Sequence, residues 1–194
     1  MAKESGVDSH ARQLARALLQ KHKVLQPPTP LETIVKAEGL QVTLRSWGKQ
    51  SRLDALLFRS HGLIAVNCDK PPLRQRFSLA HELGHYALNH EYLKQFGPDI
   101  DIDHPPEDSH PTNVKFESEA NDFAGELLVP RALLMTFRSK KDDAEDEDAK
   151  ESFRPFADLG KRLRARPLSE QELASKFRVS KDVIFIALQK NGLL

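Results

Sequence analysis

Residues 77–90, FSLAHELGHYALNH, contain two histidines four positions apart, with a glutamate directly after the first. At 3.6 residues per turn, the apolar side chains of a helix here cover most of its circumference. The remaining sector, about 100° wide, holds Arg74, Ser78, His81, Glu82, His85 and Asn89. A helix that is apolar on most sides is largely buried. The sequence therefore predicts a buried helix over 73–90 whose polar strip faces a cleft, a partner or a metal ion.

The spacing of His81 and His85 suits zinc. Residues i and i+4 lie one turn apart on one helix face, so both imidazoles can reach one ion at about 2.0–2.1 Å. Glu82 is rotated off that face, where it can take a proton from a water at the ion and later deliver it to a leaving amine. Gly84 keeps the helix surface low, so a neighbouring element can approach closely. The alternative is two histidines with ordinary hydrogen bonds and Glu82 as a surface acid.

A catalytic zinc site normally has a third protein ligand and one open position. The chain offers five candidates for this ligand: His90, His104, His110, Glu117 and Glu119. His90 follows on the same helix and is expected to point elsewhere. His104 and His110 lie within 97–113, a segment rich in proline, glycine and acidic residues that is typical of a loop.

Helix phase separates the two glutamates of a second helix, predicted over 114–128. Its apolar stripe, about 140° wide, consists of Phe116, Ala120, Phe123, Ala124, Leu127 and Leu128. Glu117 falls inside this stripe, whereas Glu119 falls outside it, toward the solvent edge with Glu126. A carboxylate on a buried face is costly unless it is paired or bound to a metal, which favours Glu117 as the third ligand.

Asn121 lies one turn beyond Glu117 and is a plausible hydrogen-bond partner for a ligand. The alternative for Glu117 is a salt bridge to Arg74 or Arg76 on the first helix.

Other elements follow from periodicity and breakers. Strand character is found at 40–45, 53–58 and 62–67, and RSHG is a good hairpin connection between the last two. Further helices are predicted over 9–23, over 30–38 with Thr29 as its cap, and over 131–139.

Composition sets the broad class of the protein. The 194 residues, 39% of them hydrophobic, can form one core with a small appendage. The net charge of +1 excludes a global attraction to nucleic acid or acidic lipid. One cysteine, Cys68, excludes an intramolecular disulfide and fits a reducing compartment. The first residues lack the apolar core of a signal peptide, and no run approaches membrane-spanning length. We therefore expect a cytoplasmic protein with no membrane partner.

Three regions are expected along the chain: 1–139 as the main domain, 140–158 as an acidic linker or insertion, and 159–194 as a helical tail. The linker begins with KKDDAEDEDAKE, which is too charged to bury itself. The tail has two helices with caps at Ser169 and Ser180, typical of a helix-turn-helix. Its second helix is apolar almost all round and offers few base-reading side chains. We interpret the tail as a packing module on the main domain; the basic KRLRAR at 161–166 keeps DNA contact open as an alternative.

Two segments together resemble a known family. RQRFSLAHELGHYAL followed by ESEANDFAGELLVP resembles the motif pair of the ImmA/IrrE family of zinc metallopeptidases. The upstream order also fits, with an N-terminal helix, the segment PLETIVKAEGLQV and then GLIAVN. The resemblance covers about residues 10–138. It implies an α+β, gluzincin-like fold, in which a small antiparallel or mixed sheet packs on the HExxH and ExxxN helices.

The resemblance also implies residue roles and a substrate class. His81, His85 and Glu117 correspond to the family's zinc ligands, and Glu82 to its general base. Family members cleave helix-turn-helix repressors and so switch on mobile-element or stress-response genes. The acidic run 140–151 and the proline-rich loop 97–113 are departures from the family's core.

Two functional hypotheses result. The first is a zinc endopeptidase that cleaves one regulatory protein, with a helix-turn-helix repressor as the expected substrate. The second is a DNA-binding or partner-binding regulator whose metal site is structural or sensory. An intact Glu82 favours the first, because a purely structural site needs no base beside its ligand. The candidates for polarising the scissile carbonyl are Tyr86, Tyr92, His104 and His110.

Overall fold

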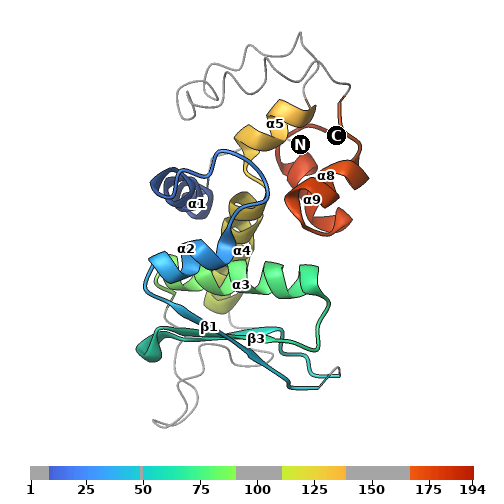
Figure 1. Cartoon of the computed structure of the whole chain (residues 1–194). Coiled ribbons are helices and arrows are strands. Elements are labelled where there is room, and N and C mark those ends of the chain that lie inside the picture. Colours follow the sequence, from blue (N-terminus) through green and yellow to red (C-terminus); the bar gives the residue numbers. More distant parts are fainter. Residues whose placement is uncertain (1–8, 49, 91–110, 139–166) are drawn as a thin grey trace.

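The computed structural model describes residues 9–48, 50–90, 111–138 and 167–194. Figure 1 shows these residues as an α+β fold, which confirms the predicted class. The helices are α1 (His10–Lys21), α2 (Leu31–Ala37), α3 (Pro72–Ala87), α4 (Pro111–Leu128), α5 (Arg131–Arg138), α8 (Glu170–Phe177) and α9 (Lys181–Lys190). The strands are β1 (Gln41–Arg45), β2 (Ala55–Phe58) and β3 (Leu63–Asn67).

The three strands form one mixed sheet in the order β1-β3-β2. β1 runs parallel to β3, and β2 runs antiparallel to it, with Ala55 opposite Val66 and Phe58 opposite Leu63. The predicted RSHG hairpin is present: a short 3₁₀ helix over Arg59–His61 leads into Gly62, whose φ of 57° is in the left-handed region that glycine adopts freely. Among the described strands, β2 is at an edge of the sheet and leads directly into the hairpin.

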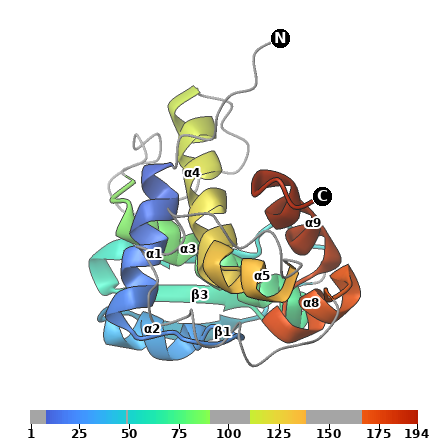
Figure 2. The ribbon, with the colours of Figure 1, turned by 90° about the horizontal axis from the view of Figure 1, so that it is seen from above.

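α3 is the central element of the fold. One side of α3 packs on the sheet, where it contacts β2 and β3 (Figures 1 and 2). The other side of α3 contacts α4, and α4 in turn contacts α1. The core runs through these layers and includes Leu57, Ile64, Leu79, Leu83, Phe123 and Leu127, all at most 4% exposed. The prediction that the helix is buried on most sides is thus confirmed, because the sheet and α4 each cover one face of it.

Several predicted helix ends differ from the structure. Thr29 does not cap α2; its hydroxyl donates to the Leu127 carbonyl at 2.8 Å, and no side chain caps that helix. The loop predicted to reach residue 113 ends earlier, because α4 begins at Pro111. α3 ends at Ala87 rather than at residue 90, because Asn89 has a φ of 54° and turns the chain out of the helix.

Glu126 was predicted at a solvent edge, and this was wrong. It is 4% exposed, because α1 covers this face of α4. Arg12 and Arg16 on α1 contact its carboxylate at 3.0 and 2.9 Å, and the backbone N–H of Arg131 donates to it at 3.1 Å. A buried charge paired in this way is tolerated, and here it joins α1 to α4.

The C-terminal helices α8 and α9 lie beside α5, and α9 contacts α4 (Figure 2). The capping box of Ser169 with Glu172 and the Ser180 cap are both present. The N–H of Leu168 donates to the Phe137 carbonyl at 3.0 Å, and Arg12 donates to Asn191 at 2.9 Å. Phe185 and Ile186 on α9 are each 47% exposed.

The predicted linker 140–158 and the KRLRAR segment lie outside the described residues, so the division into three regions stays a prediction. Within the described part of the chain, no helix is both long and apolar enough to cross a membrane.

Candidate metal centre

α3 and α4 bring three potential metal ligands together. His81 Nε2 lies 2.9 Å from His85 Nε2, and Glu117 Oε2 lies 3.1 Å from His81 Nε2. Glu117 Oε1 is 3.4 Å from His85 Nε2. One ligand atom from each of the three residues lies within 4.8 Å of the others, as a shared ion requires. The arrangement arises because the i, i+4 spacing places the two imidazoles one turn apart on one face of α3, edge to face with their planes 73° apart, and α4 crosses that face.

Helix phase predicts Glu117 on the buried, apolar face of α4, and the structure places it in a more exposed position. Its side chain is 40% exposed, whereas those of His81 and His85 are 13% and 1% exposed. The carboxylate lies at the rim of a pocket, not in the apolar core. The alternative salt bridges are not formed in the structure: Arg74 pairs with Asp54, and Arg76 donates to the Thr29 carbonyl at 2.5 Å.

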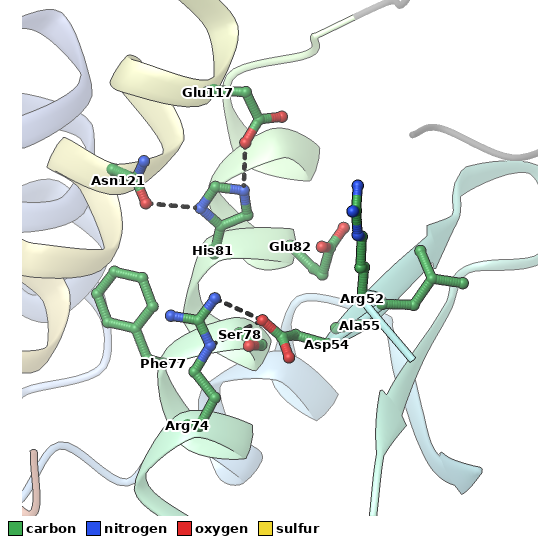
Figure 3. Close-up of a pocket in the computed structure, with 11 residues that line it drawn as sticks. Arg52, Asp54, Ala55, Arg74, Phe77, Ser78, His81, Glu82, Glu117 and Asn121 are labelled. Carbon is green, nitrogen blue, oxygen red and sulfur yellow. Dashed lines mark hydrogen bonds and ion pairs between the residues drawn. The ribbon is translucent and has the colours of Figure 1, made fainter. Parts of the chain in front are cut away.

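The other nitrogen of His81 is held by Asn121, the residue predicted to lie beside a ligand. The Nδ1–H of His81 donates to Asn121 Oδ1 at 3.1 Å (Figure 3). Because an amide oxygen only accepts hydrogen bonds, this contact places the His81 proton on Nδ1. The Nε2 lone pair is then directed toward the other two residues, which is the form that binds a metal.

His90 does not point away from the site, as the sequence predicted. It lies outside α3, is 4% exposed, and places its Nδ1 2.9 Å from His85 Nδ1. Its Nε2 contacts Glu119 Oε2 at 3.1 Å. Burial lowers the pKa of His90, against the opposing effect of the Glu119 carboxylate. Sequence reasoning missed this contact because it continued the helix through Asn89.

Glu82 lies beside the cluster in a pocket of about 350 Å³. It is 3% exposed and comes from the same turn of α3 as His81. Figure 3 shows its carboxylate next to Arg52, which precedes β2 and was not singled out from the sequence. A carboxylate that is buried and yet lines a pocket is suited to proton transfer.

Of the four candidates for polarising the scissile carbonyl, the structure describes Tyr86, and Tyr86 does not line this pocket. Tyr86 lines a different pocket, together with Leu14 and Leu18 of α1. The guanidinium carbon of Arg59 lies over the Tyr86 ring, 5.3 Å from the ring centre. Tyr92, His104 and His110 lie outside the described residues. Among the described residues, Arg52 and the paired Arg74 and Asp54 line the pocket together with Glu82 and Glu117.

The donor set fits a divalent transition metal of the zinc type. Two imidazoles and one carboxylate are a known ligand combination for catalytic zinc. One imidazole has its second nitrogen fixed by Asn121 and the other by His90, as ligands of a metal typically do. Three protein ligands leave one position open for reactants.

Gly84 sets the distance between the two ligand-bearing helices, and replacing it with alanine is expected to lower stability. A Cβ there would lie 3.0 Å from Phe123 Cδ1 and 3.3 Å from both the Cα and the carbonyl oxygen of Ala120. The overpacking, about 1–3 kcal/mol, outweighs the gain in helix propensity of about 1 kcal/mol. Because the obstacle is partly backbone, α4 must move and carry Glu117 away from the histidines.

Thermal unfolding of the metal-free protein followed by a zinc titration measures both effects. Gly125→Ala is the matched control, because a Cβ at Gly125 has nothing within 4 Å. A Gly84→Ala protein as stable as the Gly125→Ala protein would show that the close approach of α3 and α4 does not depend on glycine.

The sequence matches a family model over residues 35–189; the family is Peptidase M78, described as the IrrE N-terminal-like domain. The match extends from α2 into α9. Among solved structures, a Mycobacterium tuberculosis transcriptional regulator is similar at 13% sequence identity and a TM-score of 0.49. That alignment covers 90% of this chain and 44% of the regulator, so this chain spans less than half of the regulator's length. No curated protein matches the sequence.

Proposed function

Because the chain belongs to the ImmA/IrrE family of metallopeptidases, we propose that it is a zinc-dependent endopeptidase that cleaves a specific regulatory protein. The observation that carries this proposal is the convergence of His81, His85 and Glu117 beside the buried Glu82. The family and the His/Glu group together imply a metal. Zinc is the metal that this donor set with one open position suits best, although Mn²⁺ or Fe²⁺ can occupy similar ligands.

The proposed chemistry divides between the ion and the side chains around it. When bound, zinc lowers the pKa of water and polarises a carbonyl as a Lewis acid. Glu82 accepts the proton of the attacking water on a carboxylate oxygen and then delivers it to the nitrogen of the leaving amine. The burial of Glu82 keeps this proton away from bulk solvent. A metal site with a purely structural role has no use for such a base, which supports an enzyme over a structural or sensory site.

The substrate is proposed to bind as an extended segment beside the edge strand. Leu53, Asp54 and Ala55 line the same pocket as His81 and Glu82, and Ala55 begins β2. The edge of a sheet can take up an extended peptide by strand addition. The cleft therefore suits a flexible or locally unfolded segment of a protein. A helix-turn-helix repressor is the proposed substrate protein, in line with the family's activity, and a reducing cytoplasmic environment is the proposed location.

Incubation with candidate repressors tests this proposal. We expect cleavage of one repressor at a single site, mapped by mass spectrometry, with slow turnover of an unstructured protein such as casein. A chelator should stop the cleavage and added zinc should restore it. Casein digestion as fast as that of the best repressor would defeat the proposed specificity, and cleavage that survives complete metal removal would defeat the proposed chemistry.

A further inference from the structure

Beyond the cluster, a continuous line of polar contacts leads from His85 to the surface of α4. His85 Nδ1 lies 2.9 Å from His90 Nδ1, and His90 Nε2 lies 3.1 Å from Glu119 Oε2. The His85 and His90 side chains are buried, and the Glu119 side chain is 31% exposed. Neither His90 nor Glu119 is within the group of ligand atoms that could share an ion.

The turn that ends α3 places the His90 side chain beside that of His85. The N–H of His90 donates to the His85 carbonyl at 3.1 Å, and that of Asn89 to the Tyr86 carbonyl at 3.2 Å. This pair of bonds around a left-handed residue is a Schellman motif, which folds the residue after the turn back over the last helical turn. Arg59 also donates to the His85 carbonyl at 2.7 Å and so fixes the same turn.

α4 holds the other side of the His90 ring. Phe116 stacks on it, with ring centres 4.3 Å apart and planes 13° from parallel. Glu119 lies three residues further along α4, nearly one turn, and reaches the ring edge at Nε2. These contacts fix the plane and the rotation of the His90 ring. Its Nδ1 faces His85, and its Nε2 faces the Glu119 carboxylate.

The carboxylate sets the direction of the hydrogen bonds. An ionised carboxylate only accepts, so His90 donates to Glu119 through Nε2–H. A neutral His90 then offers the lone pair of Nδ1, to which His85 donates through its own Nδ1–H. The Nε2 of His85 is left with its lone pair, directed at His81 and Glu117. Every link of the line agrees with His85 as a metal ligand.

From these contacts we infer that His90 and Glu119 are positioning residues for the metal ligand His85, a role that rests on the proposed metal site. The His90 ring fixes the rotation and the tautomer of His85. Glu119 places a negative charge at the far side of His90. Through His90, this charge makes the lone pair of His85 Nε2 a stronger ligand for a cation. Partners of this kind typically change metal affinity by about 10–100-fold. His81, by contrast, contacts the neutral amide of Asn121.

Metal affinity in matched variants tests the role, with Zn²⁺ in competition against a chromophoric chelator. His90→Phe keeps a ring against Phe116 but loses both nitrogens, and we expect zinc affinity to fall about 10–100-fold. Glu119→Gln keeps a hydrogen-bond acceptor and removes only the charge, and we expect a fall of about tenfold. Asp122→Asn removes the same charge from α4, but Asp122 faces Ser9 and Lys190; we expect a change of less than about twofold.

Two further readouts separate positioning from a general structural effect. The Co²⁺ absorption spectrum of Glu119→Gln should shift relative to wild type, while the unfolding temperature of its metal-free form should not. The double variant His90→Phe/Glu119→Gln should bind zinc as His90→Phe does, because Glu119 acts through His90.

The outcomes distinguish a failure of the proposed metal site from a failure of the positioning role of His90 and Glu119. A wild-type protein that binds no metal overturns the proposed metal site and this inference together. Wild-type binding of zinc with an unchanged affinity and Co²⁺ spectrum in Glu119→Gln overturns this inference alone. A double variant whose loss equals the product of the two single losses also overturns it, since the two residues would then act independently.

Discussion

Replacing Glu82 with glutamine is expected to abolish proteolysis and leave metal binding intact. Glu82 lies next to His81 in the sequence but outside the group of three convergent ligand atoms. Glutamine has nearly the same size and fits the same buried position, but its amide cannot accept a proton from water. General acid–base catalysis typically contributes about 10²–10⁴-fold to the rate, and a loss in that range is expected in kcat, with little change in KM.

The measurement pairs steady-state cleavage of the identified substrate with elemental analysis of the same protein sample. Wild type provides the reference for both. Cleavage undiminished in Glu82→Gln would contradict the assigned base, and loss of the metal together with activity would make Glu82 part of the metal site rather than its base.

Replacing Glu117 with alanine is expected to empty the metal site and so remove all activity. The carboxylate is the single contribution of α4 to the ligand group, within 3.1 Å of His81 Nε2 and 3.4 Å of His85 Nε2. Without it two ligands remain, which is fewer than a catalytic zinc site normally needs. We expect less than about a tenth of an equivalent of metal in the purified variant, as for His81→Ala and His85→Ala.

Glu119→Ala is the comparison variant on the same helix, two residues away; it is expected to weaken zinc binding without emptying the site. It should still hold the metal when zinc is in excess, because its carboxylate faces His90 instead of the ligand group. The reverse result, with Glu119→Ala empty and Glu117→Ala full, would show that the wrong carboxylate was chosen.

The sequence predicted the elements of this fold better than the contacts between them. Strong periodicity identified α3 and α4, and the hairpin residues identified β2 and β3, because these features depend on residues close in the chain. Its position in an apolar stripe predicts Glu117 as a ligand, yet its side chain is 40% exposed at the rim of a pocket. Its position beside both histidines depends on how α4 crosses α3, which Gly84 permits and helix phase alone does not determine.

Two residues that the sequence placed wrongly, Glu126 and Thr29, share one physical cause, since a distant segment decides the environment of both. Glu126 is buried because Arg12 and Arg16 of α1 cover it. Thr29 is not a cap because the Leu127 carbonyl of α4 accepts its hydroxyl. His90 is an exception, because asparagine is one of the residues that adopts the left-handed conformation at a helix end, and Asn89 was a local signal that could have placed His90 over His85.

The most direct test of the proposed metal site is a crystal structure of the zinc-loaded protein with an anomalous difference map at the zinc edge. We predict a single strong peak bonded to His81 Nε2, His85 Nε2 and a Glu117 carboxylate oxygen, at about 2.0–2.2 Å from each. His90 and Glu119 should lie outside the bonding distance. A peak bonded to Glu119 or His90 in place of Glu117, or no peak between α3 and α4, would contradict the account.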